Sequence, residues 1–429
     1  MGMRDLLFNV RTKKPIGYRF SSIVLGMCLV FPAVAVSNEA PQTLTLADAV
    51  TLTLQQHPEL QIFNSQQRVM EGRIQQASVG ERPEIGLMIE DALGTGEHSA
   101  LKSMQSTLSF SWLLQQDLID SRVNTAKTEA TQLDIEKQIK ALDLSSQVAK
   151  HFIDLLVKQE RLKLNLIAEK QAKEVVKTVA KRVQAGKSSA VETQLAKAEL
   201  IRRGLAVEDI EHELKASQYQ LASQWGKPKA SYRFNGNLLD MPAVPSVDSQ
   251  LNLLKKHPRF QQFATAQRIA QSQMELARIE AKPQWQVTAG VRRYEASDDF
   301  GLVAGISIPW GSSDRNAGTI AALQAQQDVL ANEQNALMQA QDAQLYVLLQ
   351  EMAHSAHVID TVRSDIVPTL EKALSEASNA FDKGLLSYNQ YNDVYRELLS
   401  AQYQLLDAFE SLHLQHIEIQ RLTGTSISQ

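Results

Sequence analysis

The chain has 429 residues, enough for two or three ordinary domains or for one long repeated architecture. Its formal net charge of −4 and pI of about 6.2 give no sign of the basic surface that a nucleic-acid partner requires. Mean hydropathy is −0.24, and no uninterrupted apolar run after residue 37 reaches 18 residues, so we expect no bilayer-spanning helix there.

Residues 1–37 are typical of an export signal, because basic residues precede an apolar segment at 23–36 and small residues end it. An N-terminal membrane anchor is the alternative, but the apolar segment is short and Pro32 interrupts it. Cys28 lies inside this segment and is the only cysteine; lipidation there is disfavoured by Met27 before it. Removing the signal leaves no cysteine, which excludes disulfides and thiolate metal sites.

The remaining sequence contains an internal repeat, whose two copies are offset by about 200 residues. His57-Pro58 recurs as His257-Pro258, within similar flanking residues. Further landmarks recur in the same order: Arg82-Pro83 with Lys282-Pro283, Trp112 with Trp310, Gly186 with Gly384, and Gly226 with Gly424. The pattern predicts a first repeat at 38–226, a proline-rich linker at 227–247 and a second repeat at 248–429.

Each repeat is predicted to begin with a short helix, at about 45–56 and 247–256. The helix ends at His-Pro because the residue before a proline disfavours the helical conformation. A second helix restarts at the proline, which is tolerated in a first turn, and runs to about 81 or 281.

A strand pair follows in each repeat, at 83–113 and at 283–310, because apolar and polar residues alternate there. The residues expected to share a face are Ile85, Leu87 and Ile89; Met104, Leu108, Phe110 and Trp112; Trp285, Val287, Ala289 and Val291; and Leu302, Ala304, Ile306 and Ile308. Strands of this length cross a membrane when tilted in a barrel. A hairpin packed on helices in a water-soluble protein is the alternative.

The rest of each repeat is predicted to be a very long helical hairpin. Residues 115–185 contain neither glycine nor proline and are rich in good helix formers. The matching helix at about 314–383 contains Pro368, where we expect a kink. Gly186 and Gly384 are expected to end these helices, with Ser188 or Ser387 capping the return helix to about 225 or 422.

Four strands cannot cross a membrane alone, because open sheet edges leave backbone groups unpaired in hydrocarbon. Copies of the chain must therefore pool their strands into a closed barrel. Two copies would give about eight strands and three about twelve, and the larger barrel leaves a lumen. The pattern by itself does not choose between them.

The ordered set of features resembles the TolC family of outer-membrane efflux channels over residues 43–425. These features are Leu46-Ala47-Asp48-Ala49 with His57-Pro58, the proline before each strand pair, and the two tip glycines. The resemblance implies a mainly α fold with a small membrane β part: duplicated long helical hairpins forming a trimeric α-barrel, capped by a 12-stranded β-barrel with four strands per chain. It implies an outer-membrane channel with a long periplasmic portion, the passive exit duct of a tripartite efflux pump.

The resemblance also implies partners and site residues. The partners are two other copies, a periplasmic adaptor, an inner-membrane transporter of the RND type and outer-membrane lipid. The residues implied at the adaptor-docking tips are Arg182, Gly186, Lys187, Ser188, Lys383, Gly384, Leu385 and Ser387. Glu192 and Asp393 are implied at the periplasmic aperture, although Gln390 stands where another acid is expected. Similarity to the CzcC-like branch implies heavy-metal cations as cargo.

No residue constellation predicts an enzyme, a cofactor or a resident metal. His354 with His357, and His413 with His416, have helical spacing, but neither an acid nor a third histidine falls four residues after either pair to complete a site. Gly94-Thr95-Gly96 lacks the strand–turn–helix context of a phosphate loop. The functional alternative is a periplasmic adaptor or coiled-coil scaffold, which would carry one helical hairpin between small β domains.

Overall fold

The computed structural model describes residues 42–228, 232–311 and 314–427; the expected export signal at 1–37 lies outside them. The described residues belong to one compact unit, Pro41–Gln429. Its helices are α1 (Leu46–Gln56), α2 (Pro58–Ala77), α3 (Gln116–Gln184), α4 (Ala190–Ser223), α5 (Val247–Leu254), α6 (Pro258–Glu280), α7 (Ala317–Thr361), α8 (Val367–Asp382) and α9 (Tyr388–Thr423). Its strands are β1 (Gln42–Leu44), β2 (Glu84–Glu90), β3 (Gln105–Leu114), β4 (Tyr232–Phe234), β5 (Trp285–Tyr294) and β6 (Asp299–Ser307).

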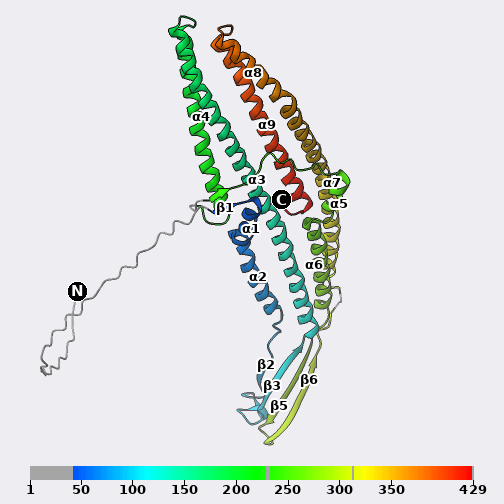
Figure 1. Ribbon diagram of the computed structural model, residues 1–429. Coiled ribbons are helices and arrows are strands. Elements are labelled where there is room, and N and C mark those ends of the chain that lie inside the picture. Colours follow the sequence, from blue (N-terminus) through cyan, green and yellow to red (C-terminus); the bar gives the residue numbers. More distant parts are fainter. Residues whose placement is uncertain (1–41, 229–231, 312–313, 428–429) are drawn as a thin grey trace, which may run out of the picture. The chain divides into compact units, whose positions relative to one another are not determined.

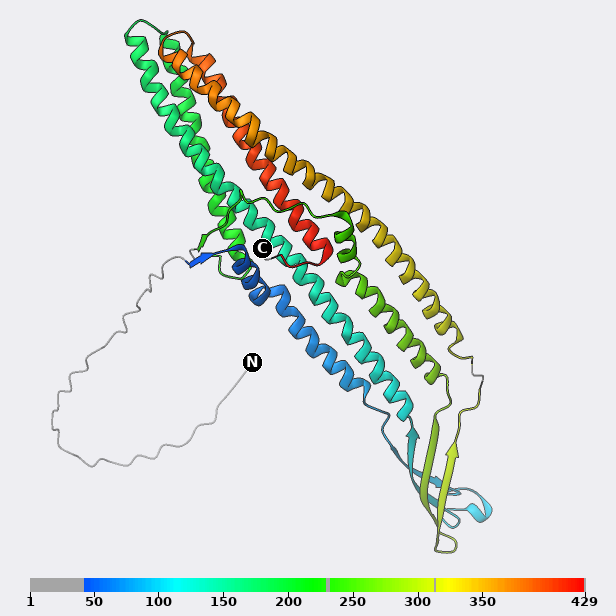
Figure 2. The ribbon, with the colours of Figure 1, turned by 45° about the vertical axis from the view of Figure 1, so that its right-hand side comes forward.

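The predicted strand pairs are confirmed, and they join into one antiparallel sheet in the order β2-β3-β5-β6. The central pairing of β3 with β5 connects strands far apart in the sequence. In both views of the ribbon the sheet lies at one end of this unit and the turns between α3 and α4 and between α8 and α9 lie at the other (Figures 1 and 2).

The two histidine–proline pairs separate helices as predicted, and the structure adds a role for the histidines. His57 is the N-cap of α2 and His257 is the N-cap of α6. Each ring Nδ1 accepts a hydrogen bond from the backbone N–H two residues on, at 3.2 Å from Glu59 and 3.0 Å from Arg259. The imidazole thus satisfies one of the donors that a helix start leaves free.

The first long helix, α3, is continuous over 69 residues, a length of about 100 Å. The second is not: a π-helical turn at Val362–Ile366 separates α7 from α8, directly before Pro368. Proline has no N–H to donate and its ring clashes with the preceding turn, so the helix adopts the wider π-helical form before it. The return helices begin at Ser189 and Ser387 as N-caps; the expectation of Ser188 was therefore wrong by one residue.

The main apolar core lies where α3, α7 and α9 pack together, around Phe152, Leu345 and Phe409. A short parallel pairing of β1 with β4, which the sequence did not predict, adds Leu44 and Phe234 to it. A second cluster joins the two hairpins near their tips through Val179, Ala196, Ala377, Phe381, Tyr388 and Tyr391. Over the described ranges, every helix lacks an apolar stretch long enough to cross a bilayer.

Candidate channel wall and hairpin tips

One face of the four-stranded sheet is apolar and exposed. Residues directly opposite each other on neighbouring strands share a face, and the register aligns Ile85, Phe110, Ala289 and Ala304 in one row across all four strands. The next row contains Leu87, Leu108, Val291 and Leu302. Leu302 is 91% exposed and Ile85 77% exposed. Such a continuous uncovered apolar face is typical of the outer face of a membrane barrel.

The opposite face is polar and internally bonded. The hydroxyls of Ser111 and Thr288 lie 2.9 Å apart across β3 and β5. The guanidinium of Arg292 donates to Thr107 Oγ1 at 2.8 Å and pairs with Glu90 Oε2 at 2.9 Å. This face has the character of a water-filled lumen.

The edges of the sheet are β2 and β6, each of which pairs on one side only in the described residues. An unpaired edge inside a bilayer costs several kcal/mol for each unsatisfied backbone group. Within a bilayer, a sheet with two such edges would therefore be incomplete.

The two hairpin tips have the same backbone design. Gly186 has φ +70° and Gly384 has φ +81°, a region that favours glycine. Lys187 N–H donates to Arg182 C=O, and Leu385 N–H donates to Ala380 C=O, both at 2.8 Å. Gly186 and Gly384 each donate to the carbonyl three residues back, at 3.0 Å. These are paired helix-ending motifs, and they leave the turns short and exposed.

Arg182 joins the two hairpins just below the tips. Its guanidinium carbon lies 4.2 Å from the centroid of the Phe381 ring, and its Nη1 donates to the Phe381 carbonyl oxygen. Phe381 in turn stacks on Tyr391, with ring centroids 5.2 Å apart. Sequence reasoning placed Arg182 at a docking surface; the structure places its charged group against the second hairpin.

The other tip residues lie in the two turns or at their borders. Lys383 is the C-cap of α8, and Leu385 follows the glycine with 76% of its side chain exposed. Ser387 forms a capping box with Gln390, whose side-chain oxygen accepts from the Ser387 N–H at 3.0 Å. Gln390, which stands where an acid was expected, therefore helps to cap the start of α9. Ser188 is half-buried, and its Oγ has no hydrogen-bond partner among the described residues.

The two predicted aperture residues lie on different return helices. Glu192 is in the first turn of α4, and its buried Oε2 has no hydrogen-bond partner among the described residues. Asp393 is exposed on α9 and accepts from Arg396 Nη2 at 2.7 Å. One oxygen of Glu192 is thus buried without a partner among the described residues, whereas Asp393 is paired with a residue one helical turn away.

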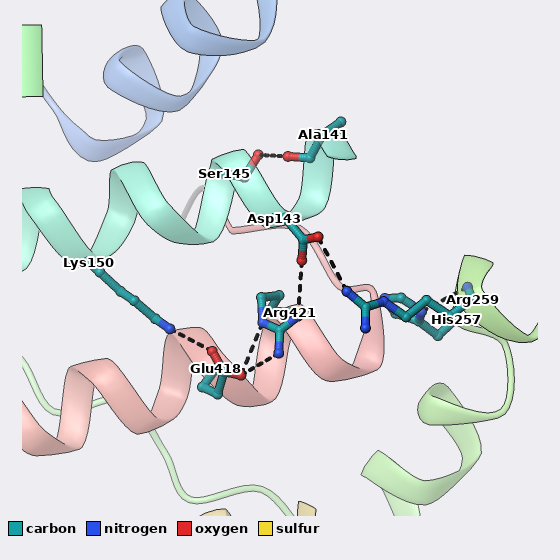
Figure 3. Close-up of polar contacts among 8 residues, drawn as sticks. All are labelled: Ala141, Asp143, Ser145, Lys150, His257, Arg259, Glu418 and Arg421. Atoms are coloured by element: carbon teal, nitrogen blue, oxygen red, sulfur yellow. Dashed lines mark hydrogen bonds and ion pairs between the residues drawn. The ribbon is translucent and has the colours of Figure 1, made fainter. Parts of the chain in front are cut away.

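A cluster of five charged residues connects α3, α6 and α9 (Figure 3). Asp143 of α3 lies 3.0 Å from Arg421 Nη1 and 3.3 Å from Arg259 Nη2. Glu418 of α9 accepts from Arg421 at 2.5 Å and from Lys150 at 2.6 Å. Sequence reasoning missed this cluster; only the Glu418–Arg421 spacing of three residues hinted at it.

The environment of this cluster shifts two pKa values downwards. Burial alone would raise the pKa of Glu418, but the hydrogen bonds from Arg421 and Lys150 outweigh it and lower the pKa to about 2. Burial, with help from the positive charge of Arg259, lowers the pKa of His257 to about 4. The neutral His257 ring is the form that can accept the capping hydrogen bond through Nδ1.

The candidate histidine pairs are not assembled into a metal centre. His354 and His357 are exposed on α7. His413 Nε2 lies 2.8 Å from the Leu238 carbonyl oxygen, and burial lowers the pKa of both His413 and His416. In the described part of the chain, no group of three or more His, Cys, Asp or Glu side chains is placed to hold a metal ion.

Comparison with known sequences finds the family model described as "Outer membrane efflux protein" over residues 49–227. The cobalt-zinc-cadmium resistance protein CzcC of Cupriavidus metallidurans is 24% identical over 405 residues, covering 93% of each chain.

Solved channel structures share the fold over nearly the whole chain. A structure of CusC matches with a TM-score of 0.71 at 14% identity, covering 89% of this chain and 92% of the other. The outer membrane protein VceC of Vibrio cholerae matches with a TM-score of 0.69 at 16% identity, covering 89% and 96%. The mainly helical channel fold expected from the sequence is therefore confirmed.

Proposed function

This chain is a member of the outer membrane efflux protein family, a family of transport channels rather than of enzymes, and from that premise we propose that three copies form the exit duct of a tripartite efflux pump. The observation that carries the proposal is the sheet, with an exposed apolar face, a polar face and two open edges. Three such sheets would form a 12-stranded barrel in the outer membrane, wide enough for a lumen. The long helices would continue this barrel into the periplasm.

We assign this chain only passive conduction, so the energy for transport would come from a partner protein. The helix tips would dock on a periplasmic adaptor, which connects the duct to an inner-membrane transporter of the RND type. The docking residues we propose are Gly186, Lys187, Ser188, Lys383, Gly384, Leu385 and Ser387. Both turns are short and exposed, and Leu385 offers an uncovered apolar side chain to a partner.

We assign Arg182 a different part in the same region. Its contacts with Phe381 fix the spacing of the two hairpins on which the tips are carried. Glu192 and Asp393 are proposed to face the periplasmic aperture. Docking would open this aperture by binding the open arrangement of tips more tightly than the closed one.

The proposed cargo is divalent heavy-metal cations. The support is the relative CzcC, whose name records cobalt, zinc and cadmium resistance. Conduction needs no resident metal centre, since an ion that binds tightly in a duct would leave it slowly.

We further propose that the chain consists of two copies of one module, 38–226 and 248–429, joined by the linker 227–247. The support is the repeated element order of short helix, histidine-capped helix, strand pair and helical hairpin. Glycines with positive φ recur at Gly186 and Gly384 and again at Gly226 and Gly424.

The docking proposal is tested with two glycine variants in a strain that depends on this protein for cobalt, zinc or cadmium resistance. Gly384→Leu places a bulky side chain at the tip, whereas Gly226→Leu imposes the same substitution at a positive φ of 76° at the far end of α4. At both sites an added Cβ meets no other atom within 4 Å, so the backbone strain of about 1–2 kcal/mol is matched.

We expect Gly384→Leu to abolish resistance while heat-resistant trimers persist in outer-membrane fractions, and Gly226→Leu to retain resistance. Unchanged resistance in Gly384→Leu would reject docking at this tip. A monomer in the soluble periplasmic extract of the unmodified protein would instead reject the duct itself.

A further inference from the structure

A cavity of about 330 Å³ lies where α6 leads into β5 and the chain leaves β6 for α7. Its lining includes Arg278, Lys282, Arg315 and Trp310, with Glu280 as the acidic residue. A volume of this size is within the range of about 300–1,000 Å³ typical of small-ligand sites. The cations outnumber the carboxylate, so the lining favours an anion.

Two of these cations are free to bind a ligand. Arg278 pairs with Glu275 at 3.3 Å, one helical turn away. Lys282 and Arg315 are exposed, and neither side chain forms an ion pair with the described residues. These two charges therefore have no ion-pair partner among the described residues, and they lie beside Trp310, which is itself fully exposed.

The tryptophans place this cavity at the edge of the membrane. Trp112, Trp285 and Trp310 are 54%, 47% and 101% exposed. Trp112 and Trp285 lie at the helix-proximal ends of β3 and β5, and Trp310 follows the end of β6 at Ser307. Trp310 follows Leu302, Ile306 and Ile308 of the exposed apolar face at even spacing. Exposed aromatic rings at the end of an apolar sheet face mark the level of lipid headgroups. The helices leave the sheet on the periplasmic side, so this is the level of the inner-leaflet headgroups.

The corresponding junction of the first half is occupied by protein. Gln115, which follows β3, is only 7% exposed, and its Nε2 donates to the Glu81 carbonyl oxygen at 3.2 Å. A Cβ placed on Gly80 would lie 2.6 Å from the same amide nitrogen. The two junctions therefore differ, and the basic cavity is a feature of the second half.

We propose that this cavity binds the phosphate of an anionic glycerophospholipid from the periplasmic leaflet of the outer membrane. Lys282 and Arg315 contact the phosphate oxygens, and Trp310 packs against the glycerol and the first acyl carbons. An ammonium and a guanidinium suit a phosphate by charge and by hydrogen bonding. The inference rests on the outer-membrane placement of the sheet and adds a lipid site that anchors the second half of each subunit.

The test uses the full-length protein purified as assembled trimers in dodecyl maltoside. Dioleoyl phosphatidylglycerol is titrated in mixed micelles, with dioleoyl phosphatidylcholine as the uncharged comparison and inorganic phosphate as the headgroup alone. Binding is followed by tryptophan fluorescence and by the midpoint of thermal trimer dissociation. The variant is Lys282→Gln with Arg315→Gln. The control is Lys255→Gln with Lys256→Gln, which removes two exposed cations beyond the end of α5.

We expect phosphatidylglycerol to raise the dissociation midpoint more than phosphatidylcholine. Its apparent affinity should fall by about tenfold or more in the Lys282/Arg315 variant, since each cation near an anionic lipid contributes measurably. The Lys255/Lys256 control should match the unmodified protein.

Equal response to both lipids, or an unchanged affinity in the variant, would overturn the proposal. Equally tight binding of inorganic phosphate would show a free-anion site instead. Loss of trimers in the variant without any lipid dependence would show that a neighbouring subunit covers the cavity. In each case the unmodified protein still fractionates with the outer membrane, so failure of the lipid site remains distinct from failure of the duct.

Discussion

The guanidinium of Arg182 lies over the ring of Phe381, 199 residues further along the chain, with 4.2 Å between its central carbon and the ring centroid. A cation held over an aromatic face stabilises by about 0.5–2 kcal/mol, and the carbonyl of Phe381 adds a hydrogen bond. This contact is a direct polar bridge between the ends of α3 and α8. Together with the apolar cluster near the tips, it holds the two hairpins against each other.

Replacing Arg182 with Gln should loosen the tips without unfolding the chain. The variant loses the cation–ring contact, and we expect trypsin to cleave after the exposed Lys187 several times faster than in the unmodified trimer. Lys177→Gln is the matched control, because it removes an exposed cation whose partner Glu174 is on the same helix, at 2.7 Å. Equal cleavage rates in Arg182→Gln and in the control would show that the bridge does not hold the tips.

Replacing Glu418 with Gln should destabilise the junction of α3 and α9. The carboxylate accepts from both Lys150 and Arg421, and its side chain is only 15% exposed. Hydrogen bonds to charged groups contribute about 1.5–3 kcal/mol, so the midpoint of thermal trimer dissociation should fall measurably. Glu174→Gln, at a site 58% exposed, should change the midpoint little. If the midpoint fell less in Glu418→Gln than in Glu174→Gln, the stabilising role of Glu418 would be contradicted.

Stability should decrease in two stages as the pH falls. His257 has a lowered pKa of about 4 when folded, so the unfolded chain takes up its proton first and stability is lost between about pH 6.5 and 4. Glu418 has a lowered pKa of about 2, so its contribution is complete above about pH 4.5 and is lost towards pH 2.

The measurement for these two stages is the urea midpoint of the purified protein across that pH range. His257→Asn keeps a side chain that can cap α6, and it should remove the upper stage only. If His257→Asn loses as much stability as the unmodified protein in the upper stage, another group must be responsible for that stage.

The two faces of the sheet should respond oppositely to a charge. Ala304 lies in the exposed apolar row, and Ala304→Arg places a guanidinium where we expect lipid, at a cost of about 2–4 kcal/mol near the middle of a bilayer. Thr288→Arg places the same group on the polar face, where water solvates it. Heat-modifiable migration of the assembled trimer should be lost in the first variant and kept in the second. The reverse result would show that the polar face contacts lipid and the apolar face lines the lumen.

Much of the fold was readable from the sequence because local patterns encode it. Alternation at 285–291 predicted a strand, and the register confirms that Val287, Ala289 and Val291 share a face. The tip glycines were readable because a helix end with positive φ favours a residue without a Cβ. The capping role of His257 was not readable, because a histidine before proline indicates a break but not where its ring points.

The sequence by itself determined the helices, the strand pairs and the turns, since each depends on residues close together in the chain. Only the tertiary structure decided that Arg182 meets Phe381, that Asp143 meets Arg421 across 278 residues, and that β1 pairs with β4. It also placed Lys282 and Arg315 around one cavity. Contacts between distant segments leave no periodic trace in a single sequence, because they depend on how finished helices and strands pack against one another.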